Sequence, residues 1–64
     1  MKEEIQNIKN KIVGEILRQR QLRDLTQRQM ADKLGITEQA YFNIENGKVK
    51  IEKLHDWLEK IIKL

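Results

Sequence analysis

The polar side chains of this chain suit hydrogen-bonded recognition better than they suit catalysis. Gln39 and Asn43 each carry an amide whose donor and acceptor match the edge of adenine, and the Glu38 carboxylate can accept from the amino group of cytosine. The chain has no Ser or Cys to act as a nucleophile and no glycine-rich phosphate loop. Its one histidine, His55, precedes Asp56 on an expected helix, where adjacent side chains point apart. We therefore expect no enzymatic activity, no cofactor and no metal site.

Length and charge set further limits. The chain has 64 residues, 13 Lys and Arg, 10 Asp and Glu, and a formal net charge of +3, which permits a nucleic-acid partner without requiring one. We expect one small domain over residues 1–64 with a marginal core. The absence of Cys excludes disulfides and thiolate zinc sites. The acidic start, at Glu3 and Glu4, is unlike a signal peptide, and no apolar run is long enough to span a bilayer. We therefore expect a cytoplasmic protein without membrane contact.

Apolar residues at three- and four-residue spacings predict four amphipathic helices. The expected ranges are about 3–23, 26–34, 38 to either 43 or 45, and 51–64, so the predicted fold class is all-α: a small four-helix domain with an extended first helix. Gly14 lies inside the first pattern, where glycine is unfavourable in a helix. We interpret it as a point at which another element approaches closely.

The segment from residue 26 to residue 45 has the features of two short helices that meet at a steep angle. Thr26 and Gln29 have the spacing of a capping box, and Thr37 can cap the second helix. Gly35 suits the left-handed residue of a tight turn, and Ala31 is small enough for close helix contact. These are the requirements of a helix-turn-helix.

The run from Leu25 to Thr37, LTQRQMADKLGIT, resembles the XRE/Cro-like family of lambda-repressor-type DNA-binding domains. The similarity covers about residues 12–54. Its later matched positions are Tyr41, Ile44, Glu45, Asn46, Gly47 and Lys48. The resemblance implies a fold of four or five helices and transcriptional regulation by operator binding.

Base contacts are expected from the start of the third helix, because the second helix of such a motif enters the major groove with its N-terminal residues at the base edges. The outward positions there are Thr37, Glu38, Gln39, Phe42 and Asn43. Two interpretations of Phe42 stay open. Its ring lies on a thymine methyl group, or it folds onto the core edge or against a partner chain.

Phosphate contacts are expected on either side of this helix. The resemblance points to Gln27 at the start of the second helix, and to Asn46 and Lys48 in the loop after the third. Arg28 and Lys50 join them by position and charge. For each basic residue taken alone, an ordinary solvated surface position is the alternative.

The resemblance also implies a structural salt bridge between Arg20 and Glu45 that ties the first helix to the end of the third. Asp24 departs from the family pattern, which commonly has Gly there, so the resemblance does not fix where the first helix ends. The chain stops at Leu64, where the family frequently continues into a fifth helix that makes the dimer contact.

The last expected helix carries more apolar residues than one small core easily uses, and the surplus indicates a partner surface. We predict a homodimer held by Trp57, Ile61, Ile62 and Leu64, although a Trp in this position is more often a core residue. The predicted function is a repressor that binds a palindromic operator in double-stranded DNA as a homodimer, with no small-molecule ligand. The alternative is a protein-interaction module of the antitoxin type that uses the same fold.

Overall fold

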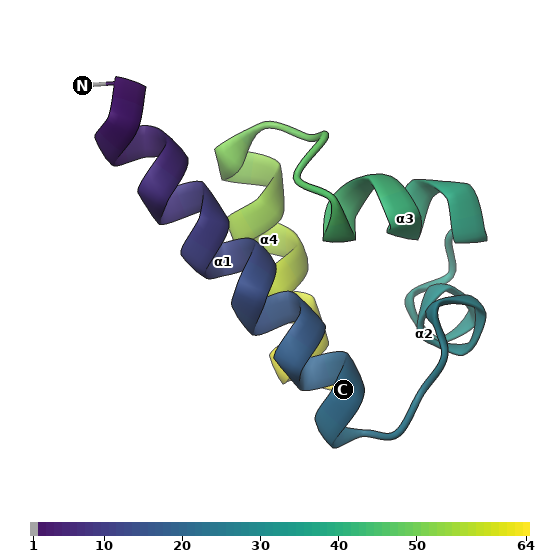
Figure 1. Cartoon of the computed structure of the whole chain (residues 1–64). Helices are drawn as coiled ribbons and strands as arrows, with labels where there is room; N and C mark the ends of the chain where they lie inside the picture. Colours follow the sequence, from purple (N-terminus) through teal and green to yellow (C-terminus); the bar gives the residue numbers. More distant parts are fainter. Residues whose placement is uncertain (1) are drawn as a thin grey trace.

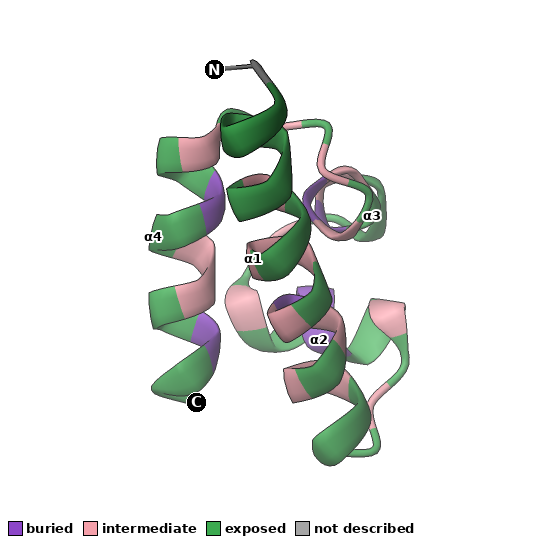
Figure 2. Cartoon of the chain, turned by 60° about the vertical axis from the view of Figure 1, so that its left-hand side comes forward, coloured by how far each residue is buried: buried purple, intermediate pink, exposed green. Residues whose placement is uncertain are grey.

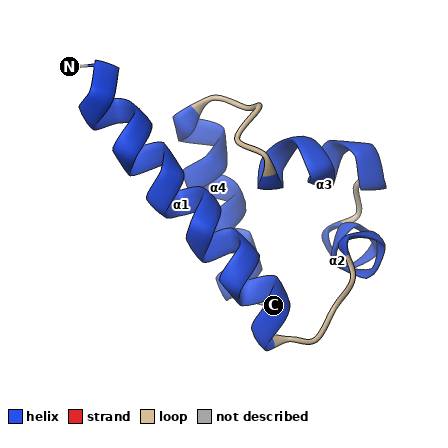
Figure 3. Ribbon diagram, in the orientation of Figure 1, coloured by secondary structure: helices blue, strands red, loops and turns tan. Residues whose placement is uncertain are grey.

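The computed structural model describes residues 2–64, and Met1, the first residue of the predicted domain, lies outside the described residues. Within this range the chain forms four helices and no strand, which confirms the all-α fold with a long first helix (Figures 1 and 3). The helices are α1 (Lys2–Leu22), α2 (Gln27–Leu34), α3 (Glu38–Glu45) and α4 (Ile51–Ile62).

The helices form two pairs. α1 and α4 lie side by side and run in the same direction, while α2 packs against α3, which also contacts α1 (Figures 1 and 2). Just beyond α1, the Arg23 guanidinium Nη2 donates to the carbonyl oxygen of Ile61 at 2.9 Å and joins the C-terminal ends of α1 and α4. No helix in the described part of the chain combines the length and the apolar character needed to cross a membrane.

The core is one cluster to which every helix contributes. Its members, each no more than 2 % exposed, are Ile16, Met30, Ala31, Tyr41, Ile44, Leu54 and Ile61. The buried positions of α4 face α1 (Figure 2). The pairing of α2 with α3 is therefore fixed to α1 and α4 through shared apolar packing, which stabilises the fold by removing apolar surface from water.

The prediction that Ile61 contacts a partner chain is wrong. Ile61 is 0 % exposed, because it lies two turns after the equally buried Leu54 on the stripe of α4 that packs into the core. The other residues of the predicted dimer surface differ. Ile62 and Leu64 are 56 % and 51 % exposed, and Trp57 is half-buried against the core.

The interpretation of Gly14 is also wrong. A Cβ atom built at Gly14 would meet no atom within 4 Å outside the backbone of its own helix, so no element of residues 2–64 approaches it closely. Gly14 is exposed on α1, two residues before the buried Ile16, and a helix places such neighbours on different faces.

Three helices end in the same backbone hydrogen-bond pattern. After each of α1, α2 and α3, one residue with positive φ donates its N–H to the carbonyl three residues back, and the next residue donates to the carbonyl five back from itself. The positive-φ residues are Asp24 (57°), Gly35 (72°) and Gly47 (69°). Asp24 thus takes the conformation that glycine adopts without steric cost.

Replacing Asp24 with glycine is expected to stabilise the fold by about 0.5–1 kcal/mol, because an L-residue pays a steric penalty in the left-handed region that exceeds the extra chain entropy of glycine. Urea titration of the two proteins measures the difference. Gly35→Ala is the matched control and should destabilise, since its added Cβ meets nothing within 4 Å and only the backbone conformation opposes it. A less stable Asp24→Gly protein would show that the aspartate side chain itself stabilises this turn.

Candidate nucleic-acid interface

The start of α2 is fixed by a complete capping box. The N–H of Gln29 donates to Thr26 Oγ1 at 3.1 Å, and the N–H of Thr26 donates to Gln29 Oε1 at 2.9 Å. This confirms the capping pattern expected from the sequence. The first N–H groups of a helix have no partner within it, and together with the helix dipole they favour an anion at this end. A phosphate group beside Gln27 and Arg28 would meet both.

α3 is committed to the core on one side only. Thr37 caps it by accepting from the N–H of Ala40 at 3.1 Å, and Tyr41 and Ile44 are 0 % and 2 % exposed. The opposite side is in solvent, as the exposed and buried positions around α3 in Figure 2 show. The predicted base-reading residues on it are Glu38, Gln39 and Phe42, which are exposed, and Asn43, which is half-buried.

The two predicted adenine-reading amides are joined to each other. Gln39 Nε2 donates to Asn43 Oδ1 at 3.2 Å, one helical turn apart. This bond holds both side chains on the solvent side of α3. It leaves Gln39 Oε1, the second Gln39 N–H and the Asn43 amide nitrogen available, so Gln39 keeps the donor and acceptor that a paired contact to adenine needs.

Phe42 lies on the surface and not in the core. Phe42 is 39 % exposed. Lys48 Nζ lies 5.7 Å from the centroid of its ring, within the range of a cation–π contact. The ring is therefore partly exposed on α3, with the positive charge of Lys48 close to it. Of the two interpretations of Phe42, folding onto the core edge has no support in this arrangement.

The predicted phosphate contacts fall into two groups. Two amides already have partners in the protein: Gln27 Nε2 lies 3.5 Å from Glu45 Oε2, and Asn46 Nδ2 donates to the carbonyl oxygen of Phe42 at 2.8 Å, which caps the end of α3. The three basic residues Arg28, Lys48 and Lys50 are exposed. The positive charge near α3 thus comes from exposed basic side chains. The amides of Gln27 and Asn46 instead make contacts within the protein at the start of α2 and the end of α3.

Arg20 and Glu45 form the ion pair behind the interface. Arg20 Nη2 lies 2.9 Å from Glu45 Oε1, and Nε adds bonds of 3.2 and 3.3 Å to the two carboxylate oxygens. The side chains are 18 % and 7 % exposed. Arg20 Nη1 also donates to the carbonyl oxygen of Leu25 at 2.9 Å, so one side chain joins α1, the loop before α2 and the end of α3. The hydrogen bonds to Glu45 raise the pKa of Arg20, which stays charged.

Sequence reasoning missed two features near this pair. The Tyr41 hydroxyl is buried without a hydrogen-bond partner among residues 2–64, and this burial, with the nearby Glu45 charge, raises the pKa of Tyr41. Arg23 donates to the Ile61 carbonyl across the fold. The apolar character of position 41 was visible in the helical pattern, but neither hydroxyl placement nor the partner of an isolated arginine has a sequence signal.

The chain has the geometry of a helix-turn-helix: two capped helices with a left-handed glycine between them, the second helix having one side in the core and amides on the other. The helix-turn-helix family model matches residues 16–54, more than half of the chain. The chain therefore belongs to the XRE-type helix-turn-helix family, a family of DNA-binding regulators and not of enzymes. No curated protein and no solved structure matches the chain.

Proposed function

We propose that this chain is a transcriptional repressor that binds a palindromic operator as a homodimer, with α3 in the major groove. The observation that carries the proposal is the division of α3 into a buried side, with Tyr41 and Ile44, and a solvent side with joined amides at Gln39 and Asn43. Residues 1–64 then act as one DNA-binding domain whose reading unit lies at about 26–45.

Sequence would be read by the solvent side of α3. The proposed base-reading residues are Thr37, Glu38, Gln39, Phe42 and Asn43. The Thr37 hydroxyl already caps α3, so its methyl group is the part left for a thymine methyl contact. Glu38 stands in the first turn, where the helix dipole also stabilises its charge.

Affinity without sequence preference would come from phosphate contacts at the two ends of the motif. Arg28 at the start of α2, and Lys48 and Lys50 after α3, carry exposed positive charges for this role. Gln27 and Asn46 are proposed to contribute through the ends of the helices that they already hold. Release of counterions on binding makes this part of the affinity depend on salt.

A homodimer would present α3 twice. Two copies related by a two-fold axis would place their recognition helices in successive major grooves, about 34–36 Å apart, and would match a palindromic site. Of the residues predicted for this contact, Ile62 and Leu64 are exposed, Trp57 is half-buried against the core, and the buried Ile61 cannot reach a second copy.

Duplex DNA is expected to be retarded by the protein at low salt and much less at high salt. Each phosphate that Arg28, Lys48 or Lys50 contacts should add about −0.9 to the slope of log affinity against log salt concentration. This contribution is repeated for each copy of the protein that binds. Gel retardation of random duplexes at two salt concentrations measures it, and selection of bound duplexes then finds the operator. Absence of any shift at either concentration would contradict the proposal and favour a protein-interaction module of the antitoxin type.

A further inference from the structure

The two amides on the solvent side of α3 differ in how firmly the fold holds them. Gln39 is the second residue of α3 and is exposed, whereas Asn43 lies one turn further along and is half-buried. The Lys48 N–H donates to the carbonyl oxygen of Asn43 at 2.9 Å, which ties the backbone of Asn43 to the loop after α3. Asn43 also has the shorter side chain, with one rotatable bond fewer than Gln39. Asn43 is therefore the fixed member of the pair.

The bond between the two amides holds Gln39 by its nitrogen. Gln39 Nε2 donates to Asn43 Oδ1 at 3.2 Å. Because an amide group is planar, a bond that fixes its nitrogen also limits where its oxygen lies. The held amide keeps Oε1 and its second N–H for the groove, which is the acceptor and donor pattern that adenine matches with its N6 amino group and N7.

A held amide discriminates between bases better than a free one. A free glutamine can turn its nitrogen toward guanine, whose N7 and O6 both accept hydrogen bonds. With the nitrogen held by Asn43, Gln39 Oε1 stays toward the base, and one acceptor then faces another over guanine. A side chain held before binding also loses less rotamer freedom when it reaches its base. Both effects favour adenine over the other bases.

We propose that Asn43 is a positioning residue for Gln39. Besides its own proposed base contact, Asn43 fixes the Gln39 amide in the orientation that reads adenine, so that two neighbouring base pairs of each half-site are read as one coupled unit. The inference rests on the proposed function, and it names the residue that sets the preference of Gln39 for its base.

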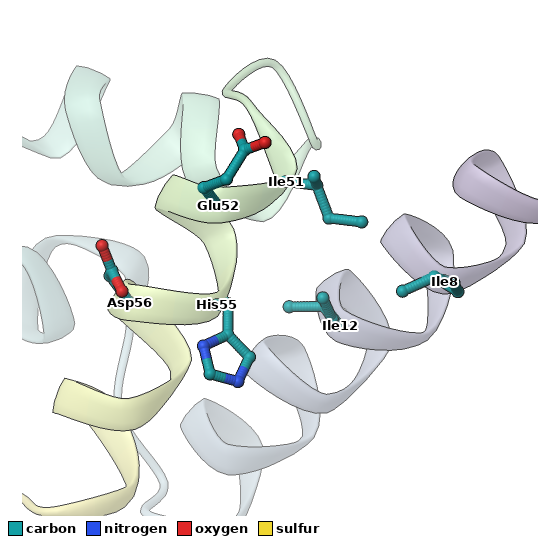
Figure 4. Close-up of a pocket in the computed structure, with 6 residues that line it drawn as sticks. All are labelled: Ile8, Ile12, Ile51, Glu52, His55 and Asp56. Carbon is teal, nitrogen blue, oxygen red and sulfur yellow. The ribbon is translucent and has the colours of Figure 1, made fainter.

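The amide pair lies on a different surface from the apolar groove between α1 and α4. This groove of about 380 Å³ lies near the N-terminal ends of the two helices and is lined by Ile8, Ile12, Ile51, Glu52, His55 and Asp56. In Figure 4 the isoleucines of α1 and α4 point toward each other across the groove, and all six residues belong to these two helices. A substitution at Asn43 therefore alters the recognition side of α3 and leaves the groove as it is.

Binding of the full chain to single-base variants of the selected operator tests the positioning role. Gln39→Ala first identifies the base pair that Gln39 reads. Asn43→Ala should lower the preference for adenine at that same base pair about threefold, because Gln39 is no longer held. The melting temperature should not fall, since alanine favours a helix more than asparagine does. An unchanged preference at the Gln39 base pair, or an equal loss of affinity for every operator variant, overturns the inference.

Asn43→Asp separates the positioning role from a base contact of Asn43 itself. Aspartate keeps an oxygen that accepts from Gln39 Nε2, but it has no N–H to donate to a base. The preference at the Gln39 base pair should therefore stay close to that of the wild type, while the preference that Asn43 sets at the neighbouring base pair is lost. The added negative charge lowers affinity for all duplexes alike, so preference is taken as a ratio of affinities. An Asn43→Asp protein that loses the adenine preference as Asn43→Ala does overturns the inference.

The same bond on α1 supplies the control. Gln6 Nε2 donates to Asn10 Oδ1 at 2.9 Å, with the spacing of the pair on α3. Asn10→Ala removes this bond far from the recognition helix in sequence and should leave base preference unchanged. If Asn10→Ala lowers the adenine preference as much as Asn43→Ala, the effect comes from general helix stability and the inference is wrong.

A measurement without DNA separates the inference from the proposed function. The order parameter of the Gln39 side-chain amide, from nitrogen-15 relaxation, should be higher in the wild type and in Asn43→Asp than in Asn43→Ala. Equal order parameters in the three proteins overturn the inference. A chain with Gln39 held in this way that retards no duplex overturns the repressor function and leaves the bond in place. A wild type and an Asn43→Ala protein with the same adenine preference overturn the inference and leave the repressor function in place.

Discussion

Replacing Glu45 with alanine is expected to destabilise the fold by about 3 kcal/mol, because it leaves the guanidinium of Arg20 largely buried without its counter-ion. The pair is 18 % and 7 % exposed, so water compensates little of the loss. Arg20→Ala should cost a similar amount, since the more deeply buried carboxylate would then keep only the long contact from Gln27. A domain of this length has about 3–10 kcal/mol of stability in total, so either change removes a large share of it.

The coupling between the two residues is the informative quantity. In a double-mutant cycle measured by urea titration, Arg20→Ala and Glu45→Ala should be non-additive by more than about 1 kcal/mol. The pair of Arg18 and Glu15 is the control, because it has the same chemistry at 3.0 Å but is 63 % and 37 % exposed. Its coupling should be about 0.2–0.5 kcal/mol. Equal coupling energies for the two pairs would mean that Arg20 and Glu45 are solvated in solution.

Arg20→Lys separates the charge of Arg20 from its hydrogen bonds. A lysine keeps the charge, but it cannot donate to both carboxylate oxygens and to the Leu25 carbonyl at once, as the guanidinium does. The variant should therefore recover only part of the stability that Arg20→Ala removes. Because the pair joins α1 to the end of α3, its loss should also weaken DNA binding through the placement of the recognition helix.

The helix-turn-helix could be predicted from sequence because its signals are local. Thr26, Gln29 and Thr37 each bond a backbone group three residues away, and Gly35 acts at its own φ angle, so their roles follow from spacing alone. The turn at Asp24 is also decided locally. It forms although glycine is replaced there, and the aspartate takes the left-handed conformation.

Features that depend on how helices pack were beyond the reach of a single-helix pattern. The apolar surplus of α4 did not show which of its residues the core uses: Ile61, two turns after Leu54, is buried, whereas Ile62 lies off that stripe and is 56 % exposed. The parallel pairing of α1 with α4, which brings Ile8 beside Ile51, has no local signal. Side-chain hydrogen bonds also lack a local signal. The four-residue spacing of Gln39 and Asn43 allows a bond between their amides, but it also allows each amide to stay separate.

Gln39→Ala is expected to remove about 1–3 kcal/mol of discrimination at one base pair in each half-site of the operator, because it deletes one paired donor–acceptor contact. It also removes the bond that orients Asn43, so preference at a neighbouring base pair should weaken as well. The melting temperature should hardly change, since an exposed bond of this kind contributes only about 0.2–0.5 kcal/mol to a helix. Binding to a panel of single-base operator variants measures the effect.

α1 offers a matched control for this substitution. Gln6 Nε2 donates to Asn10 Oδ1 at 2.9 Å, which repeats the glutamine–asparagine pair of α3 at the same spacing on another helix. Gln6→Ala should therefore reproduce any loss of helix stability while leaving DNA binding intact. If the two substitutions flattened base preference equally, the effect of Gln39 would be indirect.

Lys48→Ala should differ from Gln39→Ala in kind. It removes an exposed charge next to the recognition helix, so affinity for operator and for random duplexes should fall together, and the salt slope should decrease by about one for each phosphate that the protein no longer neutralises. Because Lys48 also lies over the Phe42 ring, Lys48→Met keeps much of the apolar contact while deleting the charge. The same lower slope in both variants would assign the effect to the phosphate backbone. A loss of base preference with an unchanged slope would mean that Lys48 acts by holding Phe42 against a base, and would move it from the phosphate contacts to the base-reading side of α3.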